Sequence, residues 1–211
     1  MKVIIVAGGR FDATPEILDL LKTADLCLAA DSGAEHLFGL GIRPHAVIGD
    51  MDSISAPTRG WLAEQGCLFL IHPPEKDQTD TELCIAHALE KGASDITILG
   101  ATGHRLDHTL ANILLLKGLD DKGVPARIID SHNEIRLVSR SVSLKGACGD
   151  ILSLVPVTEK ATGITLEGLE YPLDNAVMEM GTALGVSNRF TGTRADIRIK
   201  SGRLLVIRSR D

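Results

Sequence analysis

Residues 46–54 read Ala46-Val47-Ile48-Gly49-Asp50-Met51-Asp52-Ser53-Ile54, a short apolar run followed by two aspartates one residue apart. Such a run is typical of a buried β-strand, which Gly49 would end. If strand geometry continued through the aspartates, their side chains would project to the same side, and their repulsion would require a cation or a hydrogen-bond donor between them. The stretch therefore predicts a divalent-metal site at a strand end, with an ordinary Asp- and Gly-rich turn as the alternative.

On both sides of this stretch, residues 1–131 alternate short β-rich runs with amphipathic segments. Strands are predicted at residues 2–7, 26–30, 46–48, 67–71, 95–99 and 126–130. Helices are predicted at residues 15–22, 34–40, 58–65, 79–91 and 106–117. Because continuous Val, Ile and Leu runs are typical of strands buried on both faces, the alternation predicts βαβ units with right-handed crossovers and a parallel sheet.

The pattern changes after residue 133. Short β-rich stretches follow at residues 135–138, 141–144, 151–156, 163–166, 196–199 and 204–207, and no helix is predicted among them. They are separated by Gly, Pro, Asn and Ser, which is typical of a small antiparallel β-sandwich or barrel. We therefore expect an α/β protein, with a Rossmann-like, mostly parallel sheet and helices on both faces in residues 1–133, and an antiparallel β domain in residues 134–211.

The composition excludes several classes of partner. Of 211 residues, 44% are apolar and 24% are charged, as in globular proteins. No apolar run reaches the roughly 20 residues that span a bilayer, and the first apolar run ends too early for a signal peptide, so we expect a cytoplasmic protein with no membrane partner. The net charge of −6 and the aromatic content of 3% disfavour nucleic acid. An acidic protein that handles phosphates would need metal ions.

Cysteine and histidine patterns argue against other chemistries. The cysteines, Cys27, Cys67, Cys84 and Cys148, form no C-x-x-C pair, so we expect buried thiols and no disulfide framework. The histidines show neither an H-E-x-x-H motif nor Cys/His zinc spacing, and the chain has no G-x-S-x-G elbow. Several histidines are expected to be surface or packing residues: His36, His45, His72, His87 and His132.

Acidic residues recur where the predicted strands end. They are Asp31 after the second strand, Asp50 and Asp52 after the third, Asp77 and Asp80 after the fourth, and Asp107 after the fifth. Because ligands bind at the carboxyl edge of open α/β sheets, we expect these side chains to share one site. Structural alternatives exist: Asp31 could be a turn residue, Asp80 could favour the helix dipole within a capping box begun by Thr79, and Asp107 could pair with Arg105.

Basic residues and glycine turns accompany the carboxylates. Arg10 follows Gly8-Gly9, Lys76 precedes Asp77, and Arg105 and His108 flank Asp107. The glycine pair allows close approach to a phosphate, although it matches neither G-x-G-x-x-G nor the P-loop pattern. Residues 100–103 form a second glycine turn that opens onto a predicted helix, where free N–H groups can hold an anion. Carboxylates suited to Mg²⁺, scattered cations and glycine turns together predict phosphoryl-type transfer from a nucleotide.

Several ordered motifs resemble those of the thiamine pyrophosphokinase family. They are Asp31-Ser32-Gly33-Ala34, Gly49-Asp50-Met51-Asp52-Ser53, Lys76-Asp77-Gln78-Thr79-Asp80, Gly103-His104-Arg105-Leu106-Asp107-His108 with Ala111-Asn112, and Gly185-Val186-Ser187-Asn188. The resemblance covers essentially the whole chain and implies transfer of a pyrophosphoryl group from ATP to thiamine, giving thiamine diphosphate and AMP. It also implies a nucleotide-binding catalytic domain in residues 1–133, a thiamine-binding β-sandwich in residues 134–211, and a homodimer with thiamine near the subunit interface.

The resemblance also implies roles for individual residues. The Mg²⁺ ligands, direct or through water, would be Asp31, Asp50, Asp52 and Asp80. The ATP phosphates would contact Gly8, Gly9, Arg10, Lys76, Gly103, Arg105 and His108. The substrate-binding residues would be Thr79, Asp80, Ser187 and Asn188, the last two at the pyrimidine of thiamine. The catalytic residues would be Asp52, Asp80, Asp107 and Arg105, and we hypothesise that Asp80 or Asp52 accepts the proton of the attacking hydroxyl.

Two features depart from the family pattern. His104 stands where the family usually has a second glycine, and no aromatic residue lies between Arg194 and Asp196, near where some relatives place a ring against thiamine. Two alternatives stay open: a diphosphokinase acting on another primary alcohol, such as a hydroxymethylpterin, and a non-catalytic thiamine- or nucleotide-binding regulator. The Ser187-Asn188 motif favours thiamine over the first, and retention of all the predicted metal carboxylates argues against the second.

Overall fold

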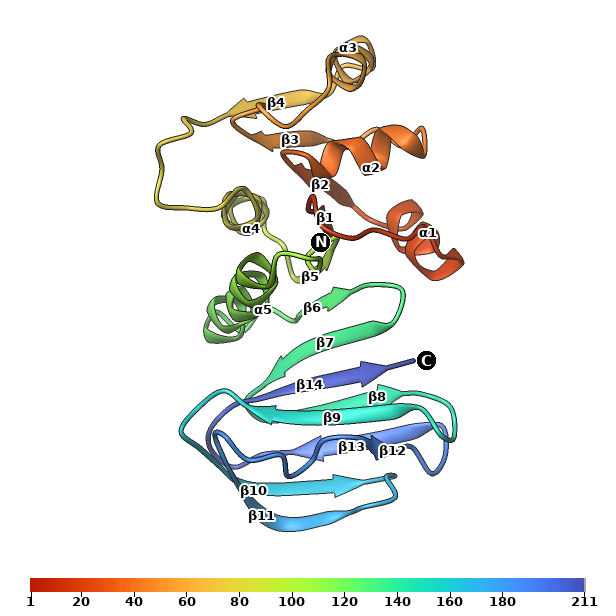
Figure 1. Ribbon diagram of the computed structural model, residues 1–211, viewed down its shortest axis with the longest axis vertical. Coiled ribbons are helices and arrows are strands. Elements are labelled where there is room, and N and C mark those ends of the chain that lie inside the picture. Colours follow the sequence, from red (N-terminus) through yellow and green to blue (C-terminus); the bar gives the residue numbers. More distant parts are fainter. Residues whose placement is uncertain (211) are drawn as a thin grey trace. The chain divides into compact units, whose positions relative to one another are not determined.

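A computed structural model describes residues 1–210, and the chain divides into two units, Met1–Ser131 and a second unit that begins at His132 (Figure 1). Each unit has its own cluster of buried apolar side chains. Among the described residues, no helix has both the length and the apolar character needed to cross a membrane.

The first unit is built on a parallel sheet with the strand order β6-β5-β1-β2-β3-β4. Its strands are β1 (Lys2–Val6), β2 (Leu26–Ala30), β3 (Ala46–Gly49), β4 (Leu68–Ile71), β5 (Asp95–Leu99) and β6 (Ala126–Ile129). Neighbouring strands run parallel; Ile4, for example, lies beside Cys27 in β2 and beside Thr97 in β5. The central strands β1, β2 and β5 are almost wholly buried, which explains their continuous apolar sequences.

Helices cover both faces of this sheet. They are α1 (Pro15–Lys22), α2 (Gly33–Gly39), α3 (Ala56–Glu64), α4 (Asp80–Glu90) and α5 (Leu106–Asp121). Figure 1 shows α1 and α2 on one face and α4 and α5 on the other. The chain steps outward from β1 to β4 and then returns to place β5 on the far side of β1, so right-handed crossovers put the later helices on the opposite face. A topological switch point therefore lies between β1 and β5, where such sheets bind ligands.

Local signals explain most helix boundaries. Helices α1, α3 and α4 begin after the N-caps Thr14, Ser55 and Thr79, whose side chains each accept a hydrogen bond from the backbone N–H three residues later. Helix α5 ends at Asp121, beyond the predicted end at residue 117, because Gly118 is accommodated inside it. The chain leaves this helix at Gly123, where φ is 69°.

The second unit is an antiparallel β-sandwich. Its strands are β7 (Asn133–Val138), β8 (Ser141–Lys145), β9 (Ile151–Pro156), β10 (Lys160–Glu167), β11 (Leu173–Glu179), β12 (Asn188–Arg189), β13 (Arg194–Arg198) and β14 (Leu204–Ser209). Within this unit, one layer has the order β12-β9-β14-β7 and the other β11-β10-β13-β8. Side chains from both layers, such as Leu154, Ile164 and Val206, share one core. No helix occurs in the part of this unit that the structure describes.

The predicted fold class is thus confirmed, with a sandwich in place of the alternative barrel. Strands β11 and β12 were not predicted. In β11, Asn175 has a φ of 50° and the pairing with β10 shifts register, so the alternation of apolar and polar residues is broken. Strand β12 has only two residues, too few to form a pattern.

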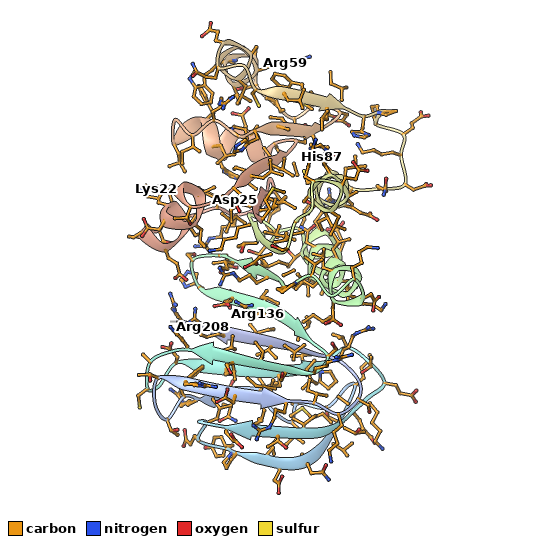
Figure 2. All side chains as sticks on the ribbon, turned by 180° about the vertical axis from the view of Figure 1, so that it is seen from behind. Lys22, Asp25, Arg59, His87, Arg136 and Arg208 are labelled. Carbon is orange, nitrogen blue, oxygen red and sulfur yellow. The ribbon has the colours of Figure 1, made fainter. Side chains whose placement is uncertain are left out.

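An ion network joins the neighbouring strands β7 and β14 of the second unit. Glu134 Oε1 lies 2.7 Å from Arg136 Nε, and Glu134 Oε2 lies 2.8 Å from Arg208 Nη2. Figure 2 labels both arginines on these strands. Arg208 Nη1 also donates to the carbonyl oxygen of Lys145 at 2.6 Å. Because Glu134 and Arg208 are buried, loss of either would leave an uncompensated charge.

Candidate active site

A cleft of about 490 Å³ lies at the carboxyl edge of the parallel sheet in the first unit. It is lined by the loops that follow β1, β2, β3 and β5, by the segment before α4 and by the first turn of α5. Its lining includes Gly9, Asp31, Asp50, Lys76, Asp80 and Arg105. The cleft therefore occupies the switch point of the sheet, at the edge where the sequence predicted a site.

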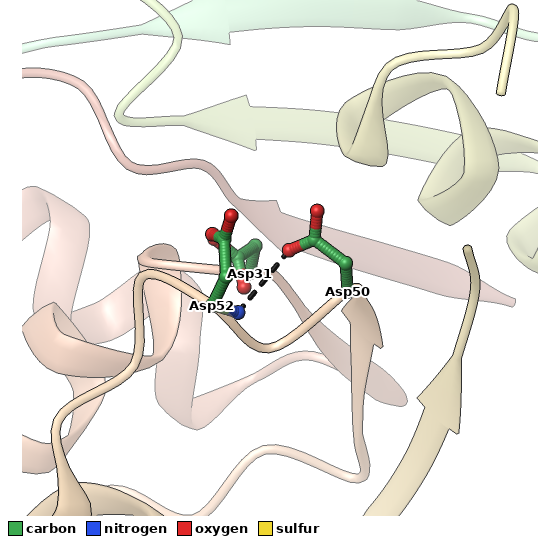
Figure 3. A group of neighbouring side chains, drawn as sticks. All are labelled: Asp31, Asp50 and Asp52. Carbon is green, nitrogen blue, oxygen red and sulfur yellow. Dashed lines mark hydrogen bonds between the residues drawn. The ribbon is translucent and has the colours of Figure 1, made fainter. Parts of the chain in front are cut away.

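Three of the predicted carboxylates converge at this edge (Figure 3). Asp31 follows β2, Asp50 and Asp52 follow β3, and each offers an oxygen within 4.8 Å of an oxygen of the other two. Asp31 is buried, with 6% of its surface exposed, whereas Asp50 is half-buried and Asp52 is exposed. Such a set of carboxylate oxygens is of the kind that Mg²⁺ and Ca²⁺ prefer.

A turn, and not strand alternation, brings these carboxylates together. Strand β3 ends at Gly49, Met51 has a left-handed φ of 67°, and the backbone N–H of Asp52 donates to Asp50 Oδ1 at 3.2 Å (Figure 3). Strand geometry therefore does not continue through the aspartates. The turn and the carboxylate cluster, which the sequence offered as alternatives, occur in the same residues. Asp31 also has a positive φ, of 42°, a strained value for a residue other than glycine.

The surroundings of Asp31 favour a bound cation. Its Oδ1 atom is buried and has no hydrogen-bond partner among the described residues. Burial raises the pKa of the Asp31 carboxyl and the charges of Asp80 and Asp50 raise it further, against a lowering hydrogen bond from Ser53. An unpaired buried polar group costs roughly 1–3 kcal/mol, which a divalent cation would offset. The donor set and the unpartnered oxygen thus fit Mg²⁺.

Asp80 lies outside this group of three and is paired with Lys76. The Nζ atom of Lys76 lies 2.9 Å from Asp80 Oδ1, and both residues line the cleft. This oxygen is otherwise buried without a well-oriented donor, so the ionic contact is its compensation. The hydrogen bond with Asp80 raises the pKa of Lys76, which keeps the ammonium charged. Thr79 caps α4 as predicted and also lines the cleft.

The Gly8–Gly9 turn packs closely against the loop after β5. A Cβ atom at Gly9 would meet the carbonyl oxygens of Gly100 and Thr102 at 2.5 and 2.4 Å. The N–H groups of Gly9 and Arg10 donate to these same two carbonyls, at 2.7 and 2.6 Å. Glycine is therefore required here for loop packing, and these two N–H groups are already used within the protein.

Other predicted phosphate-binding residues lie at the start of α5. Gly103, Arg105 and His108 line the cleft, and so does His104, the residue that departs from the expected glycine. Helix α5 begins after Arg105 without a side-chain cap. Because the first N–H groups of a helix have no intrahelical partner, this uncapped end can receive an anion.

The two predicted phosphate-binding arginines each have an aspartate partner. Arg105 Nη2 lies 2.6 Å from Asp107 Oδ2, and Arg10 Nε lies 3.1 Å from Asp12 Oδ2. Neither Arg10 nor Asp107 is among the described residues that line the cleft. Hydrogen bonding to Arg105 lowers the pKa of Asp107 to about 2, which makes this carboxylate a weak base at neutral pH. Exposed ion pairs contribute only about 0–1 kcal/mol, so both arginines can exchange their partner for a phosphate.

Sequence reasoning missed contacts that hold the loops of the cleft. His36, expected to be a surface or packing residue, has its Nε2 atom 2.9 Å from the carbonyl oxygen of Gly9, and its ring stacks on Phe11. Asn112, quoted as part of a motif, is buried and donates to the carbonyl oxygen of Ala101 at 2.9 Å. No local pattern marks such contacts, because their partners are distant in sequence.

The predicted thiamine-side residues lie in the second unit. Asn188 is buried, and its Oδ1 accepts hydrogen bonds from the N–H groups of Tyr171 and Arg189 at 3.0 and 2.9 Å. Its Nδ2 donates to the carbonyl oxygen of Tyr171 at 2.8 Å. Asn188 therefore fixes the backbone at Tyr171. Ser187 is exposed, with a φ of 60°, and the ring of Tyr171 is also exposed, so these are the groups that can meet a ligand.

The fold and the cleft are those of the α/β nucleotide-binding class of protein, and the carboxylates beside the cleft could hold a metal ion. Residues 17–128 match the family described as thiamin pyrophosphokinase, catalytic domain, and residues 135–204 match the thiamin pyrophosphokinase, vitamin B1 binding domain. The chain belongs to the thiamine pyrophosphokinase family.

Individual relatives agree with this membership along the whole chain. Thiamine pyrophosphokinase of Bacillus subtilis (strain 168) is 35% identical over 215 residues, which cover 100% of both chains. A crystal structure of thiamine pyrophosphokinase from Bacillus subtilis has a TM-score of 0.91 at 33% identity and covers 100% of both chains. One from Geobacillus thermodenitrificans has a TM-score of 0.87 at 30% identity, over 100% of this chain and 98% of that one.

Proposed function

We propose that this chain transfers the pyrophosphoryl group of ATP to the hydroxyethyl group of thiamine at the cleft of its first unit, giving thiamine diphosphate and AMP. As a member of its family the chain is an ATP:thiamine diphosphotransferase, and thiamine and ATP are its small-molecule substrates. The assignment of the site rests on one observation, the unpartnered Oδ1 atom of Asp31 beside Asp50 and Asp52. Residues 1–133 form the nucleotide-binding catalytic domain, and residues 134–211 bind thiamine.

The carboxylates at the sheet edge would hold Mg²⁺. Asp31, Asp50 and Asp52 bind it, with Asp80 contributing directly or through water. When bound, the ion neutralises phosphate oxygens and stabilises the charge that develops during transfer.

The phosphates of ATP are held by side chains and by the start of α5. Lys76 offers a fixed ammonium group, Arg105 and His108 line the cleft, and Gly103 leads into the uncapped helix end. Arg10, whose side chain is as exposed as that of Arg105, exchanges Asp12 for a phosphate oxygen. The Gly8–Gly9 turn shapes the phosphate-facing wall, while the N–H of Gly9 stays bonded within the protein.

The chain's own residues align the reaction and accept a proton. The thiamine hydroxyl must attack the β-phosphorus in line with the departing α–β bridging oxygen, so positioning and charge stabilisation supply most of the catalysis. Asp52 or Asp80 accepts the hydroxyl proton, because Asp107, with a pKa of about 2, is too weak a base. Asp107 instead orients Arg105, which stabilises charge on the transferred group. Thr79, which lines the same cleft, contacts the substrate.

In the second unit, Ser187 and Asn188 hold the pyrimidine of thiamine in different ways. Ser187 offers its exposed hydroxyl, whereas Asn188 acts by fixing the backbone at Tyr171. The chain works as a homodimer, which is supported by apolar side chains exposed along α5 at Leu106, Leu110 and Leu114. It resides in the cytoplasm, where free thiols such as Cys148 persist.

The function is tested by AMP release from ATP with Mg²⁺ and thiamine, alongside the oligomeric state by analytical ultracentrifugation. We expect AMP formation that depends on both thiamine and Mg²⁺ and is lost in Asp50→Asn. Turnover with a hydroxymethylpterin but not with thiamine would identify the diphosphokinase of another alcohol. Thiamine binding without any AMP would identify a regulator. A monomeric, fully active chain would refute the dimer alone.

A further inference from the structure

Glu35 connects the two loops that carry the metal carboxylates. It lies in the first turn of α2, four residues after Asp31, and helix α2 begins directly after Asp31-Ser32. Its carboxylate reaches across to Ser55 and Thr58 at the start of α3, the helix that follows the Asp50–Asp52 turn. One side chain thus joins the segment after β2 to the segment after β3.

Both carboxylate oxygens of Glu35 are engaged. Oε1 accepts from the backbone N–H of Ser55 at 2.6 Å, and Oε2 accepts from Thr58 Oγ1 at 2.7 Å. Thr58 is fully buried, and its Oγ1 accepts in turn from Ser55 Oγ at 3.0 Å. The hydroxyl of Ser55 thus orients the hydroxyl of Thr58, which in turn donates to the Glu35 carboxylate. Glu35 is not one of the carboxylates whose oxygens come together at the sheet edge, which are Asp31, Asp50 and Asp52.

This network fixes the far end of the loop that carries Asp50 and Asp52. The loop leaves β3 at Gly49 and is held in its middle by the buried side chains of Met51 and Ile54. At its end the backbone N–H of Ser55 is held by Glu35 and by no helical partner, since Ser55 is the N-cap of α3. Without Glu35, this end of the loop loses its hydrogen bonds to α2 and keeps only apolar contacts such as that of Phe38 with Trp61.

We infer that Glu35 is a positioning residue for the Mg²⁺ site, because it sets the separation between Asp31 on one loop and Asp50 with Asp52 on the other. The inference rests on the proposed metal role of these carboxylates. Supporting partners of metal ligands typically change metal affinity by about 10- to 100-fold when removed. Glu35 acts through the loop and not through a ligand atom, so the effect lies near the lower figure.

Binding of Mn²⁺ alone to the full chain, followed by the EPR signal of the free ion, tests this role without substrates. We expect Glu35→Ala to weaken Mn²⁺ binding about 10-fold. Glu35→Gln keeps an oxygen for Ser55 and an amide that can pair with Thr58, so it should stay within about 3-fold of the parent. Thr58→Val keeps the side-chain shape and removes one hydrogen bond to Glu35, so it should also weaken Mn²⁺ binding. This variant replaces Glu35→Ala in the test if Glu35→Ala does not fold.

A matched control separates positioning from general destabilisation. Thr14→Ala removes the cap of α1, a bond of the Thr14 hydroxyl to the N–H of Ile17 at 3.3 Å, and leaves the cleft untouched. Its Mn²⁺ affinity should equal that of the parent. Unchanged binding in Glu35→Ala and Thr58→Val, an equal loss in Thr14→Ala, or an equal loss in Glu35→Gln would each overturn the inference. If the Asp50→Asn variant binds Mn²⁺ as tightly as the parent does, the proposed metal site itself is refuted.

Discussion

The backbone N–H of Asp52 donates a hydrogen bond of 3.2 Å to the Oδ1 atom of Asp50. This bond closes the turn after β3 and orders the two carboxylates before any ion arrives. Because the turn depends on the Asp50 side chain, that residue has both a structural and a chemical role. For substitutions at the carboxyl edge of the sheet, both folding stability and activity should therefore be measured.

Asp31→Asn should make the metal-free protein more stable and nearly inactive. The change removes a buried charge whose Oδ1 atom has no partner, which is worth about 1 kcal/mol or more. Mg²⁺ should raise the melting temperature of the parent but not of the variant, and AMP formation should fall at least about 100-fold. Asp19→Asn, at an exposed aspartate of α1 that does not line the cleft, should behave like the parent. A variant whose melting temperature still rises with Mg²⁺ would contradict the assignment.

Lys76→Met should lower kcat/KM for ATP by about 100- to 1,000-fold, because it removes a fixed cation from the cleft wall. The matched control is Lys117→Met, which breaks the pair with Asp121 at the same i,i+4 spacing on the surface of α5. Steady-state kinetics should show no change there. Equal losses in both variants would mean that the Lys76 pair is only structural.

Gly9→Ala should destabilise the first unit by about 2–4 kcal/mol, because the new Cβ would lie within 2.5 Å of two carbonyl oxygens. Gly118→Ala is the opposite case. That glycine lies inside α5 with no atom near its would-be Cβ, so the substitution should stabilise by about 0.5–1 kcal/mol. Chemical denaturation measures both. Equal stability of the two variants would refute the packing argument for the turn.

Ser187→Ala and Asn188→Ala should have different effects, the first on thiamine binding alone and the second on stability as well. Ser187→Ala should raise the KM for thiamine while the unfolding free energy stays within about 0.5 kcal/mol of the parent, because its side chain is exposed. Asn188→Ala leaves partly buried backbone groups at Tyr171 unpaired and should cost about 1–3 kcal/mol in stability as well. Denaturation and thiamine kinetics on the same samples separate the two. A stable Asn188→Ala with a normal KM would contradict both roles.

The parent should be more stable than the Glu35→Gln variant near neutral pH, and this difference in unfolding free energy should shrink in acid. Burial of Glu35 opposes its ionisation, but hydrogen bonds from Thr58 and Ser55 outweigh it, so the pKa of this carboxyl lies below its ordinary value of 4.5. The native state then binds fewer protons than the unfolded state, and the stabilisation is present above pH 4.5. It is lost as the pH falls through the lower folded pKa. Urea unfolding of the parent and of Glu35→Gln, measured from neutral pH to below pH 4.5, should show that the difference in their unfolding free energies shrinks.

The sequence predicted the parallel sheet well because its signal is local. The apolar run at residues 46–48 and its neighbours can only be buried strands, and the order of strands and helices then places their carboxyl ends at one edge. The same logic predicted that Asp31 and Asp50 would meet. It did not predict the left-handed Met51, because methionine carries no preference for that conformation.

What the sequence could not predict are contacts between residues far apart in the chain. The bonds of Glu35 to Ser55 and Thr58 join two loops about twenty residues apart, and nothing in either segment indicates the other. Asn188 was expected to face thiamine. Its side chain instead forms hydrogen bonds with the backbone of Tyr171, 17 residues earlier in the chain. Such side chains become interpretable only when the fold is known.

The left-handed backbone at Asp31 and Met51 has a consequence for motion. Each such residue costs about 1–3 kcal/mol, and both are kept where glycine would be easier, one for its carboxylate and one for its buried side chain. The strain concentrates at the edge of an otherwise well-packed sheet. Amide hydrogen exchange should therefore be fastest, within the first unit's core, at the ends of β2 and β3, and Mg²⁺ should slow it there before anywhere else.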